Sequence, residues 1–337
     1  MTQAIRTIEW SDDHIVILDQ TLLPVTEVYI SLKTVDEVID AIQRLAVRGA
    51  PALGVAGAYG VVVALDQAAR EGWSAQKLSG EINRIRTARP TAVNLAWGVG
   101  QVEGLASQGR DKVFAAAAKL AADDYLANRE MARLGADWLL DKIGNRPLTL
   151  LTHCNTGSLA TTGWGTALGV VRELHLRGMA KEVFADETRP LLQGARLTAW
   201  ELAHEGIPFR LLPDGAAAMA ITTGLIDAAL IGADRVVANG DAANKIGSLG
   251  VALACDAAKI PFLVVAPEST VDRSVKVGSD IHIEMRNDEE VTQIGGVQIA
   301  PLGTKTFNPA FDVTPHKYIS ALITEKRVYN YKEGQLP

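Results

Sequence analysis

The sequence has few cysteines, few aromatic residues and no basic tract, and each shortage excludes a class of protein. Two cysteines, Cys154 and Cys255, occur in 337 residues. That is too few for a disulfide framework and is typical of a reducing compartment. The formal net charge is −6, which argues against nucleic acid and anionic membranes as main partners. The composition is that of a globular protein able to bury a sizeable core.

Several functional signatures are also missing. The first ten residues lack the basic-then-apolar order of a secretory signal. No uninterrupted apolar run approaches the roughly 20 residues that span a bilayer. The chain has no HxH, HExxH or CxxC pattern, no G-x-S-x-G elbow and no P-loop. We therefore expect a cytoplasmic protein with no metal site, which binds neither membranes nor nucleic acid.

A glycine-rich stretch, residues 163–169, imitates a dinucleotide fingerprint. Its final spacing is wrong, and we expect it inside a helix instead of at the helix start. Small residues for close helix–sheet packing explain the stretch better than a nicotinamide cofactor does.

The chain divides into two halves of different pattern. Residues 1–145 read as a mostly helical domain that begins with short strands, and a Gly-Asn-Arg-Pro break follows at residues 144–147. Residues 146–337 read as an α/β domain with strands near 148–153, 181–185, 207–212, 226–231 and 261–266. The helices between them are expected near 158–177, 190–205, 215–224 and 248–259. This alternation predicts a Rossmann-like parallel sheet.

Reactive side chains gather in the loops that follow these strands. Ligands of parallel sheets bind outside the carboxyl ends of the strands. Cys154 lies in such a loop, where a helix N-terminus would favour its thiolate. A buried structural thiol is the alternative, and it is the reading we prefer for Cys255. Adjacent strand residues face opposite ways, which argues against a dyad of Cys154 with His153.

Asp234 follows another apolar strand. A carboxyl in apolar surroundings is favoured in its protonated form and can act as a general acid. The alternative is an ion pair with the neighbouring Arg235. Gln193, one turn into the next expected helix, can reach a substrate hydroxyl. Lys245, beside Asn244, precedes a helix expected to start at Ser248. A cation at a helix N-terminus is unfavourable unless an anion binds between the cation and the helix, which indicates a phosphate ligand.

Two loops of the first half also resemble anion sites. Arg48 and Gly49 precede Ala50 and a helix-opening proline, so backbone N–H groups and a guanidinium come together. Arg89 precedes a proline in residues 89–94, with Asn and Trp following. Taken alone, each motif is better explained by an ordinary surface loop with a solvated arginine.

The combined motifs resemble a known family. They are Arg-Gly-Ala-Pro-Ala-Leu-Gly at 48–54, Arg-Pro-Thr-Ala-Val-Asn at 89–94, Thr-His-Cys-Asn-Thr-Gly at 152–157, Glu-Thr-Arg-Pro at 187–190, Gln-Gly-Ala-Arg at 193–196, Gly-Ala-Asp-Arg at 232–235, Asn-Lys-Ile-Gly at 244–247 and Asn-Pro-Ala-Phe-Asp-Val-Thr-Pro at 308–315. The chain is thereby similar to S-methyl-5-thioribose-1-phosphate isomerases of methionine salvage, which are related to regulatory subunits of eukaryotic translation initiation factor 2B.

This resemblance implies an aldose–ketose isomerase, usually a homodimer, that needs no cofactor. It implies Cys154 and Asp234 as the catalytic pair. It implies substrate contacts from Arg48, Gly49, Ala50, Arg89, Gln193, Asn244 and Lys245. Two alternatives stay open: an isomerase of another pentose phosphate, such as 5-deoxyribose 1-phosphate or ribose 1,5-bisphosphate, and a non-enzymatic regulatory subunit. Tyr59, Trp97 and Trp164 are candidates for the pocket of the 5-substituent.

Overall fold

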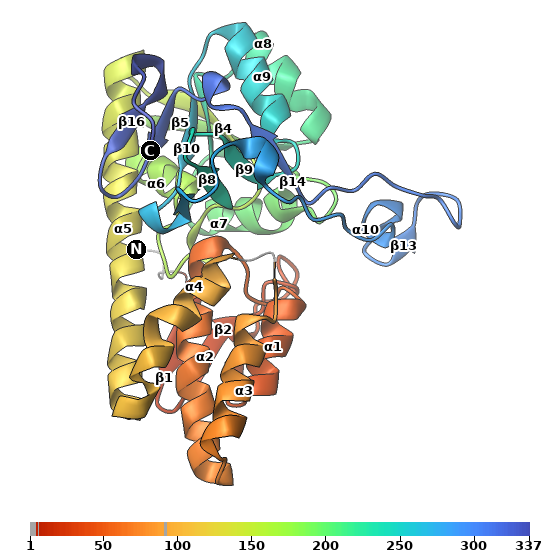
Figure 1. Ribbon diagram of the computed structural model, residues 1–337. Helices are drawn as coiled ribbons and strands as arrows, with labels where there is room; N and C mark the ends of the chain where they lie inside the picture. The colour runs from red at the N-terminus through yellow and green to blue at the C-terminus, as the bar shows by residue number, and fades with distance from the viewer. Residues whose placement is uncertain (1–4, 6, 91–92) are drawn as a thin grey trace. The chain divides into compact units, whose positions relative to one another are not determined.

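The structure is a computed structural model that describes residue 5, residues 7–90 and residues 93–337. The chain forms two compact units (Figure 1). Unit 1 comprises residues 1–129 and 156–165, and unit 2 comprises residues 130–155 and 166–337. The boundary at 129/130 lies within a helix, whereas the sequence places a boundary at 145/146, directly after that helix ends.

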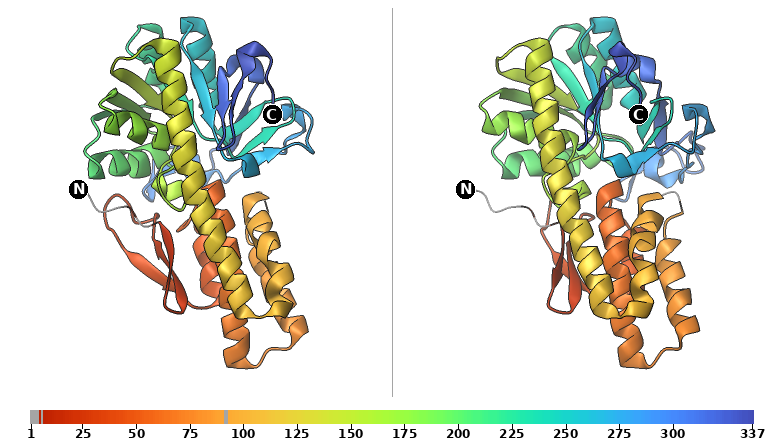
Figure 2. Two further views of the ribbon diagram at one scale, coloured as in Figure 1. Left: turned by 90° about the vertical axis from the view of Figure 1, so that its left-hand side faces the viewer. Right: turned by 60° about the vertical axis from the view of Figure 1, so that its left-hand side comes forward.

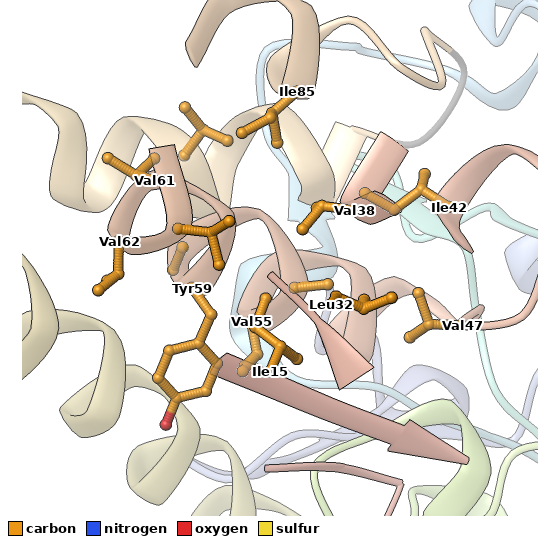
Figure 3. Packing of buried hydrophobic residues seen from close by; sticks show 14 of the residues in the cluster. Ile15, Leu32, Val38, Ile42, Val47, Val55, Tyr59, Val61, Val62 and Ile85 are labelled. Carbon is orange, nitrogen blue, oxygen red and sulfur yellow. The ribbon is translucent and has the colours of Figure 1, made fainter. Parts of the chain in front are cut away.

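Unit 1 combines a small antiparallel sheet with helices (Figure 2). The elements are β1 (Ile8–Ser11), β2 (His14–Leu18), β3 (Tyr29–Leu32), α1 (Val35–Gln43), α2 (Ala50–Glu71), α3 (Ala75–Arg86), α4 (Val93–Val102) and the first part of α5 (Arg110–Ile143). α1 begins at a capping box in which Thr34 accepts from the Glu37 N–H and Glu37 accepts from the Thr34 N–H. Side chains of Ile15, Leu32 and Val55 meet in the core between the small sheet and α2 (Figure 3).

Helix α2 is long and apolar enough to cross a membrane by length and composition. This corrects the expectation that no stretch approaches spanning length. However, 72% of its most apolar window is buried within the protein, and its side chains supply much of the unit 1 core. α2 is therefore best explained as a core helix.

Unit 2 is built on a seven-stranded sheet in the order β16-β15-β10-β7-β4-β5-β6. The strands are β4 (Leu148–Thr152), β5 (Ala180–Asp186), β6 (Phe209–Leu212), β7 (Ala228–Ile231), β10 (Phe262–Val265), β15 (Ala321–Ile323) and β16 (Val328–Asn330). Neighbouring strands are parallel except β15 and β16. Along the chain, β4, β5 and β6 follow one another toward one edge of the sheet. β7 then lies on the other side of β4, so the strand order reverses between β4 and β7.

Helices cover both faces of this sheet (Figure 1). The helices are α6 (Ala167–Leu176), α7 (Ala199–His204), α8 (Ala217–Thr222) and α9 (Ser248–Ala258). The short helix α10 (Glu289–Thr292) lies away from the sheet (Figure 1). One core cluster joins the end of α5, α6 and α7 to the sheet, and the other joins α8 and α9 to it. Consecutive residues of β4 belong to different clusters: Leu150 belongs to the first and Leu151 to the second. The reason is that successive side chains of a strand point to opposite faces of the sheet.

Smaller strands extend unit 2 beside the main sheet. A four-stranded sheet has the order β11-β8-β9-β14. Its strands are β8 (Arg235–Val237), β9 (Ala242–Lys245), β11 (Val271–Asp272) and β14 (Phe311–Thr314). A hairpin of β12 (Gln293–Ile294) and β13 (Val297–Gln298) projects from unit 2 (Figure 1).

The five predicted strands of the parallel sheet are confirmed, but two predicted helices begin later than expected. Only a three-residue 3-10 turn, Ser158–Ala160, follows β4 closely, and α6 starts at Ala167. The glycine-rich stretch therefore runs through the loop into the start of α6 and does not lie inside a helix. The helix expected from residue 190 begins as a π-helical turn at Gly194–Thr198. In both places, irregular backbone replaces the first turns of the expected helix.

Candidate active site

Cys154 lies two residues beyond β4 in a left-handed backbone conformation, with φ 66°. Its N–H donates to the Thr188 hydroxyl at 2.8 Å, and its carbonyl accepts from the Thr198 hydroxyl at 2.6 Å. A left-handed conformation is costly for a residue with a Cβ and persists only where surrounding contacts hold it. These two hydroxyls are such contacts. The expected helix N-terminus is absent here, so the helix-dipole argument for the thiolate is wrong.

The loop after β5 supplies one of these hydroxyls. Thr188 itself has φ 63°. Its N–H and the N–H of Arg189 donate to the two carboxylate oxygens of Asp214, each at 2.7 Å. The Arg189 side chain donates to the carbonyls of Pro190 and Val291. Asp214 and Arg189 therefore hold this loop, and the loop in turn holds Cys154.

A buried ionic network supplies the other hydroxyl. The Asn155 amide donates to Glu201 at 2.7 Å and to Thr198 at 3.3 Å. Arg172 pairs with Glu201 and Glu205. Arg172 is 4% exposed and Glu201 is fully buried. Breaking such a buried pair is strongly destabilising, so the network anchors the far side of the Cys154 loop.

Asp234 lies three residues beyond β7, and β7 pairs directly with β4, with Leu230 opposite Thr152. Cys154 and Asp234 thus follow the two adjacent strands between which the strand order reverses. Asp234 is partly buried, and its N–H donates to the Ala243 carbonyl at 2.9 Å. Arg235 forms an ion pair with Asp272 at 3.7 Å. Ligands of open α/β sheets bind at such a reversal.

Asn244 and Lys245 end strand β9, which leads into α9. The Asn244 amide donates to the Ser248 hydroxyl at 2.8 Å. Lys245 Nζ donates to the Ala310 carbonyl at 2.9 Å and lies 4.3 Å from the ring centre of Phe311. Both residues therefore point into a packed part of unit 2.

The start of α9 already carries an anion. Asp312, opposite Asn244 in β14, accepts from the N–H groups of Gly247 and Leu249 at 2.7 and 3.1 Å. A carboxylate in this place satisfies the helix dipole and the free N–H groups. The argument that Lys245 at this helix start requires a bound phosphate is therefore wrong, because Asp312 is the missing anion. Substrate binding by Lys245 stays a prediction.

Gln193 is buried, 5% exposed, directly before the π-helical turn. Within the described residues, its Oε1 has no hydrogen-bond partner. A buried acceptor without a donor is costly, and at such a position it indicates a ligand. Binding of a substrate hydroxyl by Gln193 stays a prediction.

His153 does not use its ring nitrogens to activate Cys154. Nδ1 lies 2.8 Å from Asp186 Oδ2, and Nε2 lies 2.8 Å from the Ile246 carbonyl. Burial acts to lower the pKa of His153, but the hydrogen bond and attraction to Asp186 outweigh it and raise that pKa. Burial also raises the pKa of Asp186, against the influence of His153. Both directions favour a proton held between the two groups.

His153, Asp186 and Asp214 bring potential metal ligands within 4.8 Å of one another. However, both nitrogens of His153 and both carboxylate oxygens of Asp214 already have protein partners. The cluster is thus better explained as a hydrogen-bond network than as a metal site.

In unit 1, Gly49 is the N-cap residue of α2 and Ala50 its first residue. Gly49 has φ 95°, and a Cβ there would lie 2.4 Å from the Ala160 carbonyl oxygen, so only glycine fits. Among the residues that the structure describes, no side chain caps this helix start. Its N–H groups are therefore available in the way an anion site requires. Arg48, directly before it, is partly buried.

Arg89 is partly buried between α3 and α4. Thr91 and Ala92 of its motif lie outside the described residues. Asn94, at 4% exposure, is buried in α4. The structure thus places Arg89 on a connecting segment of unit 1.

Two of the three aromatic candidates for the 5-substituent pocket have packing roles. Tyr59 packs against Trp10 and Phe114 at 5.5 and 6.5 Å between ring centres. The Arg129 guanidinium lies 4.0 Å from the Trp164 ring centre. Trp97, at 36% exposure, is the most accessible. Tyr59 is therefore core, which weakens its place among the candidates. Cys255 is also buried core as predicted, and burial raises its pKa to about 12.

Sequence reasoning missed Thr198 and Asp312 as site residues and gave Thr188 no specific role. Each acts through a hydrogen bond to a residue far away in the chain. Asp312 alone offered a signal, since an acidic residue interrupts an otherwise apolar strand.

Comparison with known families and proteins gives a consistent result. The model of the Initiation factor 2 subunit family matches residues 46–330. A protein of Nocardia farcinica, named probable bifunctional methylthioribose-1-phosphate isomerase/methylthioribulose-1-phosphate dehydratase, is 51% identical over 96% of this chain. The match spans 58% of that longer relative. A methylthioribose-1-phosphate isomerase of Caldanaerobacter subterraneus subsp. tengcongensis is 45% identical, covering 96% of this chain and 95% of the relative.

Two solved structures have the same fold. The 5-methylthioribose 1-phosphate isomerase of Pyrococcus horikoshii matches with a TM-score of 0.88 and 39% identity, covering 98% of this chain and 93% of that one. A protein of A. fulgidus, described as translation initiation factor eIF-2B subunit delta, matches with a TM-score of 0.85 and 41% identity, covering 97% and 96%. An α/β fold with a large, mainly parallel sheet is common to this chain and these structures.

Proposed function

This chain belongs to the Initiation factor 2 subunit family, and we propose that within it the protein is an aldose–ketose isomerase of methionine salvage. It converts 5-methylthioribose 1-phosphate to 5-methylthioribulose 1-phosphate. Relatives that match nearly end to end carry this activity in their names. The observation within the chain that carries the proposal is the position of Cys154 and Asp234 after β4 and β7, the strands where the sheet order reverses.

The reaction requires a proton donor, because phosphate on the anomeric oxygen prevents spontaneous ring opening. We assign to Asp234 the protonation of the ring oxygen, which breaks the bond between C1 and that oxygen and leaves C1 electron-deficient. Hydrogen then moves from C2 to C1, and the C2 hydroxyl loses its proton to become the ketone. The atoms of substrate and product balance without a cofactor.

Two routes exist for the hydrogen. In one, Cys154 as base takes the C2 proton to form an enediol, and C1 is then protonated. In the other, hydride moves directly from C2 to C1, and Cys154 stabilises charge. Substrate deuterated at C2 distinguishes them, since full retention of the label at C1 rules out free exchange through an enediol.

For substrate binding we propose Gln193, Asn244 and Lys245 from unit 2. From unit 1 we propose Arg48, Gly49, Ala50 and Arg89. Cationic groups and helix N–H donors offset a phosphate charge of roughly −1.5 to −2. Arg48→Ala and Arg89→Ala are expected to raise KM at least about tenfold. Arg84→Ala, which removes an exposed arginine paired with Asp36 and Glu81, is the matched control and leaves KM unchanged.

We further propose a helical N-terminal domain followed by a Rossmann-like domain, a homodimer, and a cytoplasmic location. Cys154 and Cys255 are not joined in a disulfide, which suits a reducing compartment. Light scattering of the purified protein measures the subunit number, and a monomeric mass would contradict the dimer.

The deciding experiment is an isomerase assay with 5-methylthioribose 1-phosphate that follows ketose formation. The wild type is expected to be active, and Cys154→Ser and Asp234→Asn to lose roughly 100-fold or more in kcat. Cys255→Ala and Asp256→Asn are matched controls, because they change the same residue types within helix α9 and away from the ends of β4 and β7. Unaltered kcat in Cys154→Ser or Asp234→Asn would remove that residue from the mechanism.

The isomerase assay and a binding measurement distinguish the two alternative functions. A folded wild type without activity would favour the non-enzymatic subunit, the reading that the A. fulgidus match keeps open. Calorimetry with 5-methylthioribose 1-phosphate and ribose 1,5-bisphosphate tests the 5-substituent. Tighter binding of the bisphosphate would replace the proposed substrate.

A further inference from the structure

The proposed mechanism leaves one buried titratable pair unused. His153 and Asp186 are each 1% exposed, and their side chains meet at 2.8 Å between Nδ1 and Oδ2. The other ring nitrogen, Nε2, lies 2.8 Å from the Ile246 carbonyl. Burial of charged or polar groups costs free energy unless they are paired or hydrogen-bonded, so we expect this pair to have a role in the protein.

The partners of the ring determine how many protons the pair holds. A carbonyl oxygen only accepts hydrogen bonds, so Nε2 carries a hydrogen. Between Nδ1 and Asp186 Oδ2 there must be one further hydrogen, on either the ring or the carboxyl group. The pair therefore holds one proton more than a neutral imidazole beside a carboxylate.

The surroundings favour keeping this proton. Besides Asp186, the carboxylates of Asp214, Asp312 and Glu187 act on the pair from the ends of neighbouring elements. Lys245 lies near Asp312 on the other side. Burial, Asp214 and Glu187 raise the pKa of Asp186, and Asp186 and Asp214 raise the pKa of His153 despite its burial. Both directions favour retention of the proton between Nδ1 and Oδ2, which is lost as the pH rises.

The pair links three elements that carry proposed site residues. His153 directly precedes Cys154 after β4, and Asp186 ends β5. Ile246 and Gly247 join β9, with its Asn244 and Lys245, to α9. Gly247 lies so close to the ring that a Cβ there would be 2.7 Å from Cε1 of His153. The imidazole therefore fills the space between the Cys154 loop and the turn after β9.

We propose that His153 and Asp186 are positioning residues for the isomerase reaction. Their shared proton holds the turn after Asn244 and Lys245 against the ends of β4 and β5. Loss of that proton leaves the Nδ1 lone pair facing a carboxylate, so repulsion replaces a hydrogen bond and substrate binding weakens. This inference rests on the proposed function and adds two residues to its machinery.

The first test follows the imidazole itself and does not depend on activity. Nitrogen-15 NMR of the histidine rings, with His153→Asn to assign the signal, gives the protonation state across pH. The wild-type ring is expected to lose its proton well above the ordinary histidine value of about 6.5. In Asp186→Asn the neutral amide replaces the carboxylate, and the ring is expected to titrate lower. A wild-type ring that titrates at or below the ordinary value would overturn the shared proton.

The second test compares two substitutions of Asp186 by steady-state kinetics above about pH 7, beyond the ionisation of the substrate phosphate near pH 6. The wild type is expected to show a KM that rises with pH. In Asp186→Asn the amide N–H donates to Nδ1 at every pH, so KM at neutral pH stays within about threefold of wild type and its alkaline rise disappears. Asp186→Ala leaves Nδ1 without a partner, and KM is expected to rise roughly tenfold or more at all pH values, with a smaller change in kcat.

The matched control is Asp227→Asn. Asp227 is a partly buried carboxylate that accepts from the Thr149 N–H and pairs with Arg146, at the opposite end of β4. It is expected to change thermal stability and to leave the pH profile of KM unaltered. If Asp186→Asn behaves like this control and keeps the alkaline rise in KM, the positioning role is wrong although the isomerase assignment stands. An inactive wild type whose ring still titrates high would instead refute the proposed function and keep the shared proton.

Discussion

The hydroxyl of Thr188, at the end of β5, accepts a hydrogen bond of 2.8 Å from the backbone N–H of Cys154, at the end of β4. Both residues have left-handed backbone conformations, with φ 63° and 66°. Each loop thus holds the other in a conformation that neither sequence favours alone. The thiol is positioned by the backbone of two strand ends, which explains how a reactive residue can lie on a short loop and still be held in place.

Thr188→Val tests this coupling. The substitution keeps the shape but leaves the buried N–H of Cys154 without an acceptor, which costs about 1–3 kcal/mol. We expect kcat to fall more than KM rises, because the thiol loses its position. Thr188→Ser, which keeps the hydroxyl, is expected to retain most of the activity. Equal kcat values in the two variants, measured alongside urea unfolding, would show that the hydrogen bond does not position Cys154.

Gln193→Met tests whether the unpartnered Oε1 serves the ligand. The free energy of unfolding is expected to rise by about 1 kcal/mol, since a buried polar atom without a donor is removed. At the same time KM is expected to rise, because a substrate hydroxyl loses its acceptor. Chemical denaturation and steady-state kinetics on one preparation check both. Reduced stability with an unaltered KM would mean that Gln193 supports the fold and does not bind substrate.

The buried network around Arg172 is expected to be a large contributor to the stability of unit 2. Arg172→Met leaves Glu201 charged and fully buried, which is expected to lower the free energy of unfolding by about 3–5 kcal/mol. Adding Glu201→Gln should restore part of this loss, because the uncompensated charge disappears. The unfolding midpoints of the single and double variants in urea measure the coupling. A double variant less stable than Arg172→Met would contradict this charge-based explanation.

Asp312 predicts a stability effect that depends on pH. Burial raises its pKa above the ordinary value of 3.8, despite the N–H donors of Gly247 and Leu249. The folded protein therefore binds this proton more tightly than the unfolded chain. It follows that stability decreases as pH rises from the ordinary aspartate value through the raised one. Relative to Asp312→Asn, the wild type is expected to lose stability across this window.

For Asp227, the expected dependence of stability on pH has the opposite sign, which Asp227→Asn tests. The Arg146 guanidinium and the Thr149 N–H hold the pKa of Asp227 below its ordinary value, against the influence of burial. Its contribution to stability is therefore present above pH 3.8 and is lost as the pH falls through the lowered value. Thermal unfolding of both variants across acid pH measures the two slopes. Slopes of the same sign would contradict the assignment for Asp312.

Much of unit 2 could be predicted because its signals are local. Apolar runs such as residues 226–231 report a buried strand wherever they occur. The order of strands and helices then requires a parallel sheet, and reactive residues after the strands must lie at one edge of it. This reasoning predicts Cys154, Asp234 and Gln193 as site residues.

The errors arose where long-range contacts overrule local pattern. The sequence pattern predicts a helix from residue 158, yet a 3-10 turn and irregular backbone precede α6. The charge pattern around Lys245 indicated a bound phosphate, yet Asp312, 67 positions further along the chain, occupies that helix start. No spacing rule connects residues so far apart.

The sequence by itself determined which side chains follow which strands, and hence the parallel sheet and the chemistry available at its edge. Hydrophobic period and turn residues act over a few positions, so they can be read directly from the chain. Only the tertiary structure decided the left-handed backbone of Cys154, the hydroxyls that hold it and the burial of His153 against Asp186. These depend on hydrogen bonds between strand ends that meet only after the sheet has assembled, because a buried polar group takes whichever partner the fold brings to it.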